Sequence, residues 1–148
     1  MRLVLRTTNV VADWSPSGRD VPGKTLVFSD NVTWVSVANQ NVSGPAGSHS
    51  GTNRVVRVAA ANDGVYPLNV VVQEHEATWV LNAVTAPGTQ LDRGQVTVRG
   101  VLFNRHSPPL PPELQEQRFA ITGGTGPYAR ARGYIIEAEN DRTLEIDL

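Results

Sequence analysis

Three polar side chains are of types that could do chemistry on a bound molecule. Tyr134 carries a hydroxyl that could polarise a carbonyl group, and Glu137 follows it in the same β-branched segment. A glutamate inside a fold needs a cationic partner, which Arg54 or Arg99 could supply from across the interior. Tyr134, Glu137 and Arg54 are therefore the candidate catalytic residues.

Aromatic and amide side chains are candidates for binding an apolar molecule. Trp34 and Trp79 offer large flat surfaces in the middle of predicted strands, suited to stacking on conjugated systems, although they could equally fill a core. Trp14, in a polar loop, could cover one end of the fold. The candidate substrate-binding residues are Trp14, Trp34, Asn53, Trp79, Asn82 and Phe103.

The cysteine and histidine patterns predict no metal site. The chain has no Cys, which excludes zinc fingers, iron–sulfur clusters and thiol nucleophiles. Its three His residues form no HxH or HxxxH pair. We expect His75, in a Gln-Glu-His-Glu stretch, to be a solvated strand end rather than a general base, and His49, which opens a strand, to be similar. No cofactor is expected.

Length and charge limit the class of protein further. A chain of 148 residues is long enough for one domain with one core, and we assign residues 1–148 to it. The net charge of −1 supplies no basic field for nucleic acid. No segment resembles a signal peptide or approaches the roughly 20 apolar residues that span a bilayer. We therefore expect a cytoplasmic, soluble protein.

Apolar and polar residues alternate with a period of two along most of the chain, so most of the candidate residues are expected to lie on β-strands. Seven to nine β-rich segments are separated by turn clusters such as Asn62–Gly64 and Ala86–Gly88. This pattern indicates an antiparallel sandwich or a closed barrel. We favour the barrel because the Val-rich segments lack the Lys or Pro that protect exposed edges. Residues 112–117 form either a short helix or a polyproline-like connection.

The last β segments can be read in two ways. Either Tyr134, Ile136 and Ala138 face the interior and Glu137 faces solvent, or Ile135 and Glu137 face inward and the other set packs an oligomer interface. Solubility alone favours the first arrangement.

The segment FAITGGTGPYARARGYI, residues 119–135, resembles the C-terminal signature of the allene oxide cyclase and dirigent superfamily. Its glycines are expected to supply positive φ in a tight turn. Weaker matches at 23–31, 47–52 and 94–100 occur in the family's order, and together the four cover roughly residues 23–139. A dinucleotide-binding turn is excluded because no βαβ unit follows the glycines. The resemblance implies an all-β fold: an eight-stranded antiparallel closed barrel with a central lumen that holds an apolar small molecule, usually in a dimer or trimer. It also permits the second arrangement of the last strand.

Plant members of that superfamily carry a glutamate or aspartate on the first strand, whereas residues 6–12 of this chain contain no acid. The resemblance is therefore nearest to bacterial barrel cyclases of polyketide biosynthesis. It predicts a cofactor-independent cyclase or isomerase of secondary metabolism that templates a stereoselective ring closure, of Diels-Alder type or related, on an apolar precursor. The alternatives are a non-catalytic, lipocalin-like carrier and a structural barrel whose lumen is filled by its own side chains.

Overall fold

The computed structural model describes residues 1–13, 21–60, 63–105, 108–138 and 141–148. Long strands make up most of this part of the chain, because β-branched residues and alternating burial favour extended backbone. The strands are β1 Arg2–Asp13, β2 Thr25–Val37, β3 Gln40–Asn41, β4 Pro45–Val58, β5 Val71–Leu81, β6 Val84–Ala86, β7 Thr89–Leu91, β8 Gly94–Asn104, β9 Gln117–Thr125, β10 Arg132–Ala138 and β11 Asp141–Asp147.

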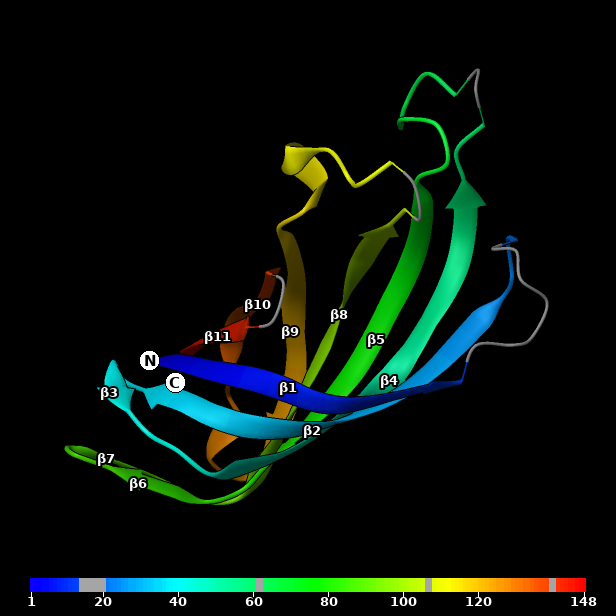
Figure 1. The fold of residues 1–148 in the computed structure, drawn as a ribbon. Helices are drawn as coiled ribbons and strands as arrows, with labels where there is room; N and C mark the ends of the chain where they lie inside the picture. The colour runs from blue at the N-terminus through cyan, green and yellow to red at the C-terminus, as the bar shows by residue number, and fades with distance from the viewer. Residues whose placement is uncertain (14–20, 61–62, 106–107, 139–140) are drawn as a thin grey trace.

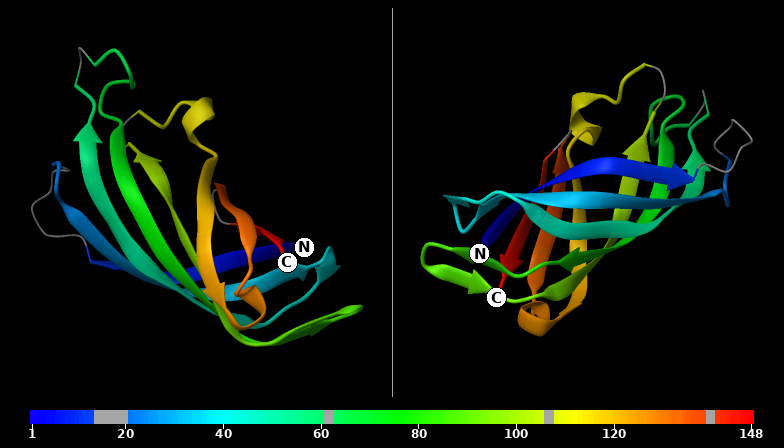
Figure 2. Two further views of the ribbon diagram at one scale, coloured as in Figure 1. Left: turned by 180° about the vertical axis from the view of Figure 1, so that it is seen from behind. Right: turned by 60° about the horizontal axis from the view of Figure 1, so that its bottom comes forward.

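Eight of these strands close into an antiparallel barrel (Figures 1 and 2). Their order is β1-β11-β10-β9-β8-β5-β4-β2, and β1 pairs with β2 to close the circle. The predicted eight-stranded closed barrel is therefore confirmed. The described residues contain only short 3-10 turns, at Pro112–Leu114 and Gly126–Tyr128, and no helix long and apolar enough to cross a membrane.

The interior face of each strand follows from the alternation of its side chains. On β2 the residues at even positions from Leu26 to Trp34 are buried, and Val27, between two of them, is exposed. The same period on β5 buries Trp79 and Leu81, and the strand ends there. Ala83, between β5 and β6, is exposed.

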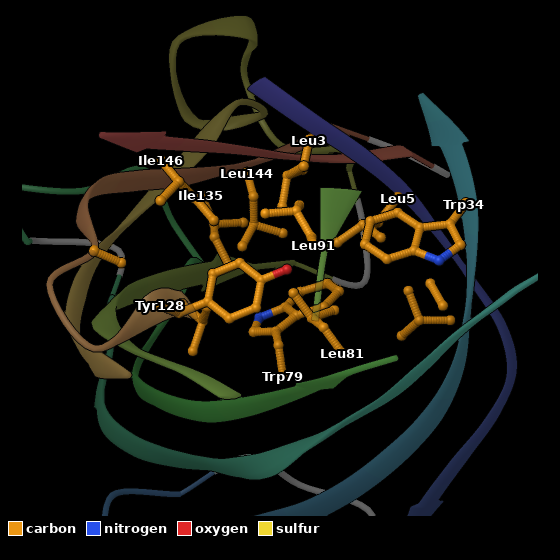
Figure 3. Packing of buried hydrophobic residues seen from close by; sticks show 14 of the residues in the cluster. Leu3, Leu5, Trp34, Trp79, Leu81, Leu91, Tyr128, Ile135, Leu144 and Ile146 are labelled. Atoms are coloured by element: carbon orange, nitrogen blue, oxygen red, sulfur yellow. The ribbon is translucent and has the colours of Figure 1, made fainter. Parts of the chain in front are cut away.

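One end of the barrel is filled by an apolar core (Figure 3). The β6–β7 hairpin packs against this end through Val84, Ala86 and Leu91, which belong to the same cluster. The side chains labelled in Figure 3 point toward one another. Tyr128 comes from the 3-10 turn Gly126–Tyr128, and those that come from strands around the barrel include Leu3, Leu5, Trp34, Trp79, Leu81, Ile135, Leu144 and Ile146.

The glycines of the Gly123–Gly126 turn serve two different purposes. The expectation of positive φ holds only for Gly126, at +61°. Gly124 lies in β9, where a Cβ atom would lie 2.3 Å from the carbonyl oxygen of Tyr128. The absence of a side chain there lets the chain turn tightly and bury Tyr128, and burial raises the pKa of its hydroxyl to about 12.

Candidate active site

A group of polar side chains lies inside the barrel, next to the apolar core. Five of them form what we call the polar cluster: Asp30 from β2, His49 from β4, His75 from β5, Glu137 from β10 and Arg142 from β11. Asp30, His49 and His75 are buried, with at most 3% of their surface exposed. Each sits on the interior face of its strand, so the barrel closure brings together residues that are far apart in the sequence.

Asp30 orients His49. The His49 Nδ1 and Asp30 Oδ2 atoms are 3.0 Å apart, and Arg142 Nη1 donates to the same oxygen at 3.1 Å. Burial alone would raise the pKa of Asp30, but the hydrogen bonds from His49 and Arg142 outweigh it and hold the pKa below its usual value.

The ionised Asp30 also selects the tautomer of His49. Arg142 Nη1 lies 3.1 Å from His49 Nδ1 as well as from Asp30 Oδ2, so both nitrogens converge on one carboxylate oxygen. A carboxylate only accepts hydrogen bonds and is a stronger acceptor than a neutral ring nitrogen. Nδ1 of His49 therefore carries the proton, and Nε2 carries a lone pair.

His75 is oriented in the same way by an amide. Its Nδ1 lies 2.6 Å from Oδ1 of Asn53, which accepts the Nδ1 proton and leaves the lone pair on Nε2. Burial, with smaller contributions from His49 and Arg142, lowers the pKa of His75 to about 3. Both imidazoles are therefore neutral near pH 7, since burial also lowers the pKa of His49 despite its bond to Asp30.

Glu137 and Arg142 form an ion pair that links the cluster to solvent. Arg142 Nε lies 2.7 Å from Glu137 Oε1, and the two side chains keep 19% and 17% of their surface exposed, respectively. Burial raises the pKa of Glu137, with a further rise from Asp30 and an opposing effect from Arg142. The least buried members of the polar cluster are therefore the ion pair on β10 and β11.

Aromatic rings pack directly on both imidazoles. The His49 ring stacks on Trp79, with centroids 4.0 Å apart and planes inclined by 23°. The His75 ring lies parallel to Phe28 at 5.5 Å and packs against Phe119 at 4.2 Å. These contacts fix the ring orientations and surround the cluster with apolar surface.

The polar cluster offers hydrogen-bond acceptors without partners among the described residues, next to the carboxyl group of Glu137, whose pKa is raised. Asp30 Oδ1, His49 Nε2 and His75 Nε2 are buried and have no hydrogen-bond partner among the described residues. Leaving such an atom unpaired costs about 1–3 kcal/mol, so these atoms are suited to a ligand that donates. Ligand atoms of His49, His75 and Glu137 also lie within 4.8 Å of one another, close enough for one metal ion to reach all three.

The expected positions of His49 and His75 are wrong. His49 and His75 are buried inside the barrel and are not solvated strand ends. The expectation of no metal site rested on the absence of closely spaced His pairs, a rule that considers only residues close in the sequence and not residues that come together across a sheet. The signal in the sequence was the strand face: Asp30 alternates with Phe28 and Val32, and His75 alternates with Ala77, all of them buried.

Glu137 lies inside the barrel, so β10 has the inward-facing residues of the second arrangement, and the inward face that solubility favoured is wrong. Ile135 is buried on the same face. The partner of Glu137 is Arg142 rather than Arg54 or Arg99. Arg54 lies on the outer wall, where it pairs with Glu74 at 2.7 Å and both side chains are largely exposed.

Tyr134 also lies outside the barrel. Its hydroxyl donates to Glu145 Oε2 at 2.8 Å, and the Arg118 guanidinium lies 5.1 Å from its ring centre. The bond to Glu145 raises the pKa of this hydroxyl. A surface pocket of about 420 Å³ here is lined by Met1, Arg2, Gly133, Tyr134, Glu145, Ile146 and Asp147, and it contains no member of the polar cluster.

The predicted binding residues fall into three groups. Trp34, Trp79 and Asn53 are buried in the interior. Asn82 follows β5 and donates to the carbonyl of Pro45 at 3.4 Å, and Phe103 packs with Tyr66 and Leu114 in a separate cluster. Trp14 lies outside the described residues. The structure thus adds Asp30, His49, His75 and Arg142 to the interior residues that were predicted from the sequence.

No protein-family model matches this chain, and no curated protein matches its sequence. The solved structure of a pyocyanin demethylase does match, with a TM-score of 0.60, 21% sequence identity, and coverage of 99% of this chain and 98% of that chain. The two proteins share a fold. At this identity the likeness shows the fold alone, and the superfamily named from sequence motifs stays a resemblance.

Proposed function

We propose that this protein is a cyclase or isomerase of small-molecule secondary metabolism that works by proton transfer inside the barrel. The observation that carries the proposal is the orientation of His49 by the ionised Asp30, with Glu137 close to it. Two titratable groups whose environments move their pKa values apart, as Asp30 and Glu137 do, are typical of an acid–base pair.

The sequence resemblance suggested ring closure directed by shape alone, and the polar cluster adds acid–base chemistry to that idea. His49 Nε2 has the lone pair needed to accept a proton from a carbon next to a carbonyl group. Asp30 is placed to stabilise the imidazolium that forms, as a carboxylate behind a catalytic histidine does.

The proposed step balances without a further reagent. The step uses the protonated form of Glu137, which burial favours by raising the pKa of this carboxyl. One proton passes from the substrate carbon to His49 Nε2, and the proton of Glu137 passes to the carbonyl oxygen, which gives an enol. In isomerisation, a different carbon of the enol takes up the proton from His49. In cyclisation, the enol carbon bonds to a second carbonyl carbon of the same molecule, and the oxygen of that carbonyl takes up the proton from His49. Proton return to Glu137 and loss from His49 restore both groups.

The surroundings of the polar cluster favour a conjugated, largely apolar substrate with one polar end. Trp79, Phe28 and Phe119 provide aromatic surface on both sides of the imidazoles, and the polar groups provide a few fixed hydrogen-bond positions. A protein with a similar barrel is named for the demethylation of pyocyanin, which supports a small-molecule role for such an interior.

The test uses 2-tetralone, a flat ketone with acidic C–H bonds, as a probe in D₂O. The protein is expected to accelerate deuterium uptake at C1, followed by proton NMR. His49→Gln and Glu137→Gln should each lower the rate by about 10²- to 10⁴-fold, the usual contribution of a general acid or base. Arg54→Ala, on the outer wall, is the control and should retain the full rate.

A non-catalytic carrier gives a different pattern. It would bind 2-tetralone, seen as a change in tryptophan emission, without accelerating exchange above the buffer rate. That result, or equal rates in the wild type and in folded His49→Gln protein, would overturn the proposal.

A further inference from the structure

Two histidines of the polar cluster each have one ring nitrogen held by a neighbour and a second ring nitrogen without a partner among the described residues, and a glutamate lies beside them. His49 Nδ1 is bonded to Asp30, His75 Nδ1 to Asn53, and Glu137 Oε1 to Arg142. His49 Nε2 and His75 Nε2 have no partner among the described residues.

This is the pattern by which proteins prepare metal ligands. A metal-bound histidine usually donates its other ring nitrogen to a carboxylate or carbonyl oxygen, which fixes the tautomer and the ring orientation. Both imidazoles here do so, one to a carboxylate and one to an amide carbonyl. They come from adjacent strands, β4 and β5, whereas Glu137 reaches the same place from β10.

We propose that His49, His75 and Glu137 bind one divalent first-row transition-metal ion, through two imidazole nitrogens and one carboxylate oxygen. A set of two histidines and one carboxylate suits such ions and leaves coordination positions open for water or another small ligand. With Glu137 ionised, Asp30 and Glu137 carry two negative charges against the one positive charge of Arg142, so the polar cluster has net negative charge and attracts a cation.

Binding requires only a small contraction of the site. One ring nitrogen of each histidine and one carboxylate oxygen of Glu137 lie within 4.8 Å of one another, whereas metal bonds of about 2.0–2.2 Å bring such atoms to about 3–4 Å apart. Rotation of the Glu137 side chain, which is the least buried of the three, can supply most of that change. The partly exposed ion pair of Glu137 and Arg142 also marks the side from which an ion enters.

The inference goes beyond the proposed function and can fail independently of it. An ion on His49 Nε2 occupies the lone pair that proton transfer uses, so the ion is expected to inhibit 2-tetralone exchange. Metal binding itself is measured without any substrate, and exchange is measured in protein treated with a chelator.

The experiment titrates Co²⁺ into chelator-treated protein from which any affinity tag has been removed, and follows the visible absorption of the ion. One ion should bind per chain, and Zn²⁺ should displace it. Loss of a residue that only supports a metal ligand typically weakens binding by about 10- to 100-fold. Asn53→Ala, which removes only the support of His75, should fall within that range, and His49→Ala, His75→Ala and Glu137→Gln should each weaken binding at least as much.

Far-UV circular dichroism shows whether each variant is folded, and Glu137→Gln preserves the size of the side chain if the alanine variants do not fold. Thr97→Ala, in an exposed hydroxyl pair with Thr122, is the control and should bind Co²⁺ like the wild type. Failure of the wild type to bind Co²⁺ or Zn²⁺, or unchanged binding in folded Glu137→Gln protein, would overturn the assignment.

Discussion

The imidazole of His49 lies flat against the indole of Trp79, with ring centroids 4.0 Å apart. This contact joins the polar cluster to the apolar core, because Trp79 is also part of that core. The same imidazole is bonded to Asp30, so a single side chain couples a carboxylate, a free lone pair and an aromatic surface.

Trp79 should therefore report the protonation of His49. A protonated imidazole in contact with indole changes the emission of the indole, and burial lowers the pKa of His49, so the change should occur below pH 6.5. An acid titration of tryptophan fluorescence, run alongside circular dichroism to detect unfolding, measures this. Trp79→Phe should abolish the change, and a midpoint at or above pH 6.5 would contradict the burial of His49.

His75 should make the fold less stable in mild acid. Its pKa is about 3 in the folded protein and about 6.5 in the unfolded chain, so between these values the unfolded state binds more protons and stability falls as pH falls. From pH 7 to pH 5 this costs about 2 kcal/mol. Glu137, whose pKa is raised, acts in the opposite direction, so a matched variant is required.

That variant is His75→Gln, which does not titrate and keeps a donor for Asn53. Urea unfolding at pH 7 and pH 5 should show a smaller loss of stability in His75→Gln than in the wild type, by about 2 kcal/mol. Equal losses in the two proteins would show that His75 does not stay neutral in the fold.

Arginines inside and outside the barrel should differ sharply in their effect on stability. Arg142→Met leaves Asp30 and Glu137 without their cation and should cost about 3 kcal/mol or more, because one partner of a buried pair has been removed. Arg54→Ala breaks an exposed pair with Glu74 and should leave the melting temperature almost unchanged. Similar melting temperatures for the two variants would argue against a buried polar cluster.

Gly124 tests the packing of the turn near the C-terminus, and Gly64, which lies between β4 and β5, is the control. Gly124→Ala places a Cβ atom against the Tyr128 carbonyl oxygen and should destabilise by about 1–3 kcal/mol, as overpacking does. Gly64→Ala meets no atom within 4 Å and should be neutral within about 0.5 kcal/mol. Thermal unfolding of both variants gives the comparison, and a tolerated alanine at 124 would refute the close approach.

The barrel was predictable from the sequence because alternation marks each strand and the turns mark its ends. On β2 the alternation even identifies the interior face, from Leu26 through Phe28 to Trp34. An acidic residue on the interior face of a strand, such as Asp30 on β2, indicates that the barrel has a polar interior at that level. Residue types weighed one at a time do not reveal this signal, which is why Asp30 was missed.

The assembly of the site was not predictable in the same way. His49 and His75 are joined through the pairing of β4 with β5, whereas Arg142 reaches Asp30 only because the barrel closes. The inward direction of Glu137 depends on strand register, which a single-residue shift would reverse. Spacing rules for metal ligands do not detect the proposed set of His49, His75 and Glu137 for the same reason, since they apply to neighbours along the chain.

The protonation state of the two buried imidazoles decides most directly whether this interior can transfer protons and bind a metal ion. Long-range ¹H–¹⁵N NMR at pH 7, on protein with labelled histidine, measures it. We predict that His49 and His75 are both neutral, with the proton on Nδ1 and a bare Nε2. Assignment by His49→Gln and His75→Gln separates the two signals. A proton on Nε2 of both rings, or charged imidazoles at pH 7, would contradict both the proton-transfer site and the metal site.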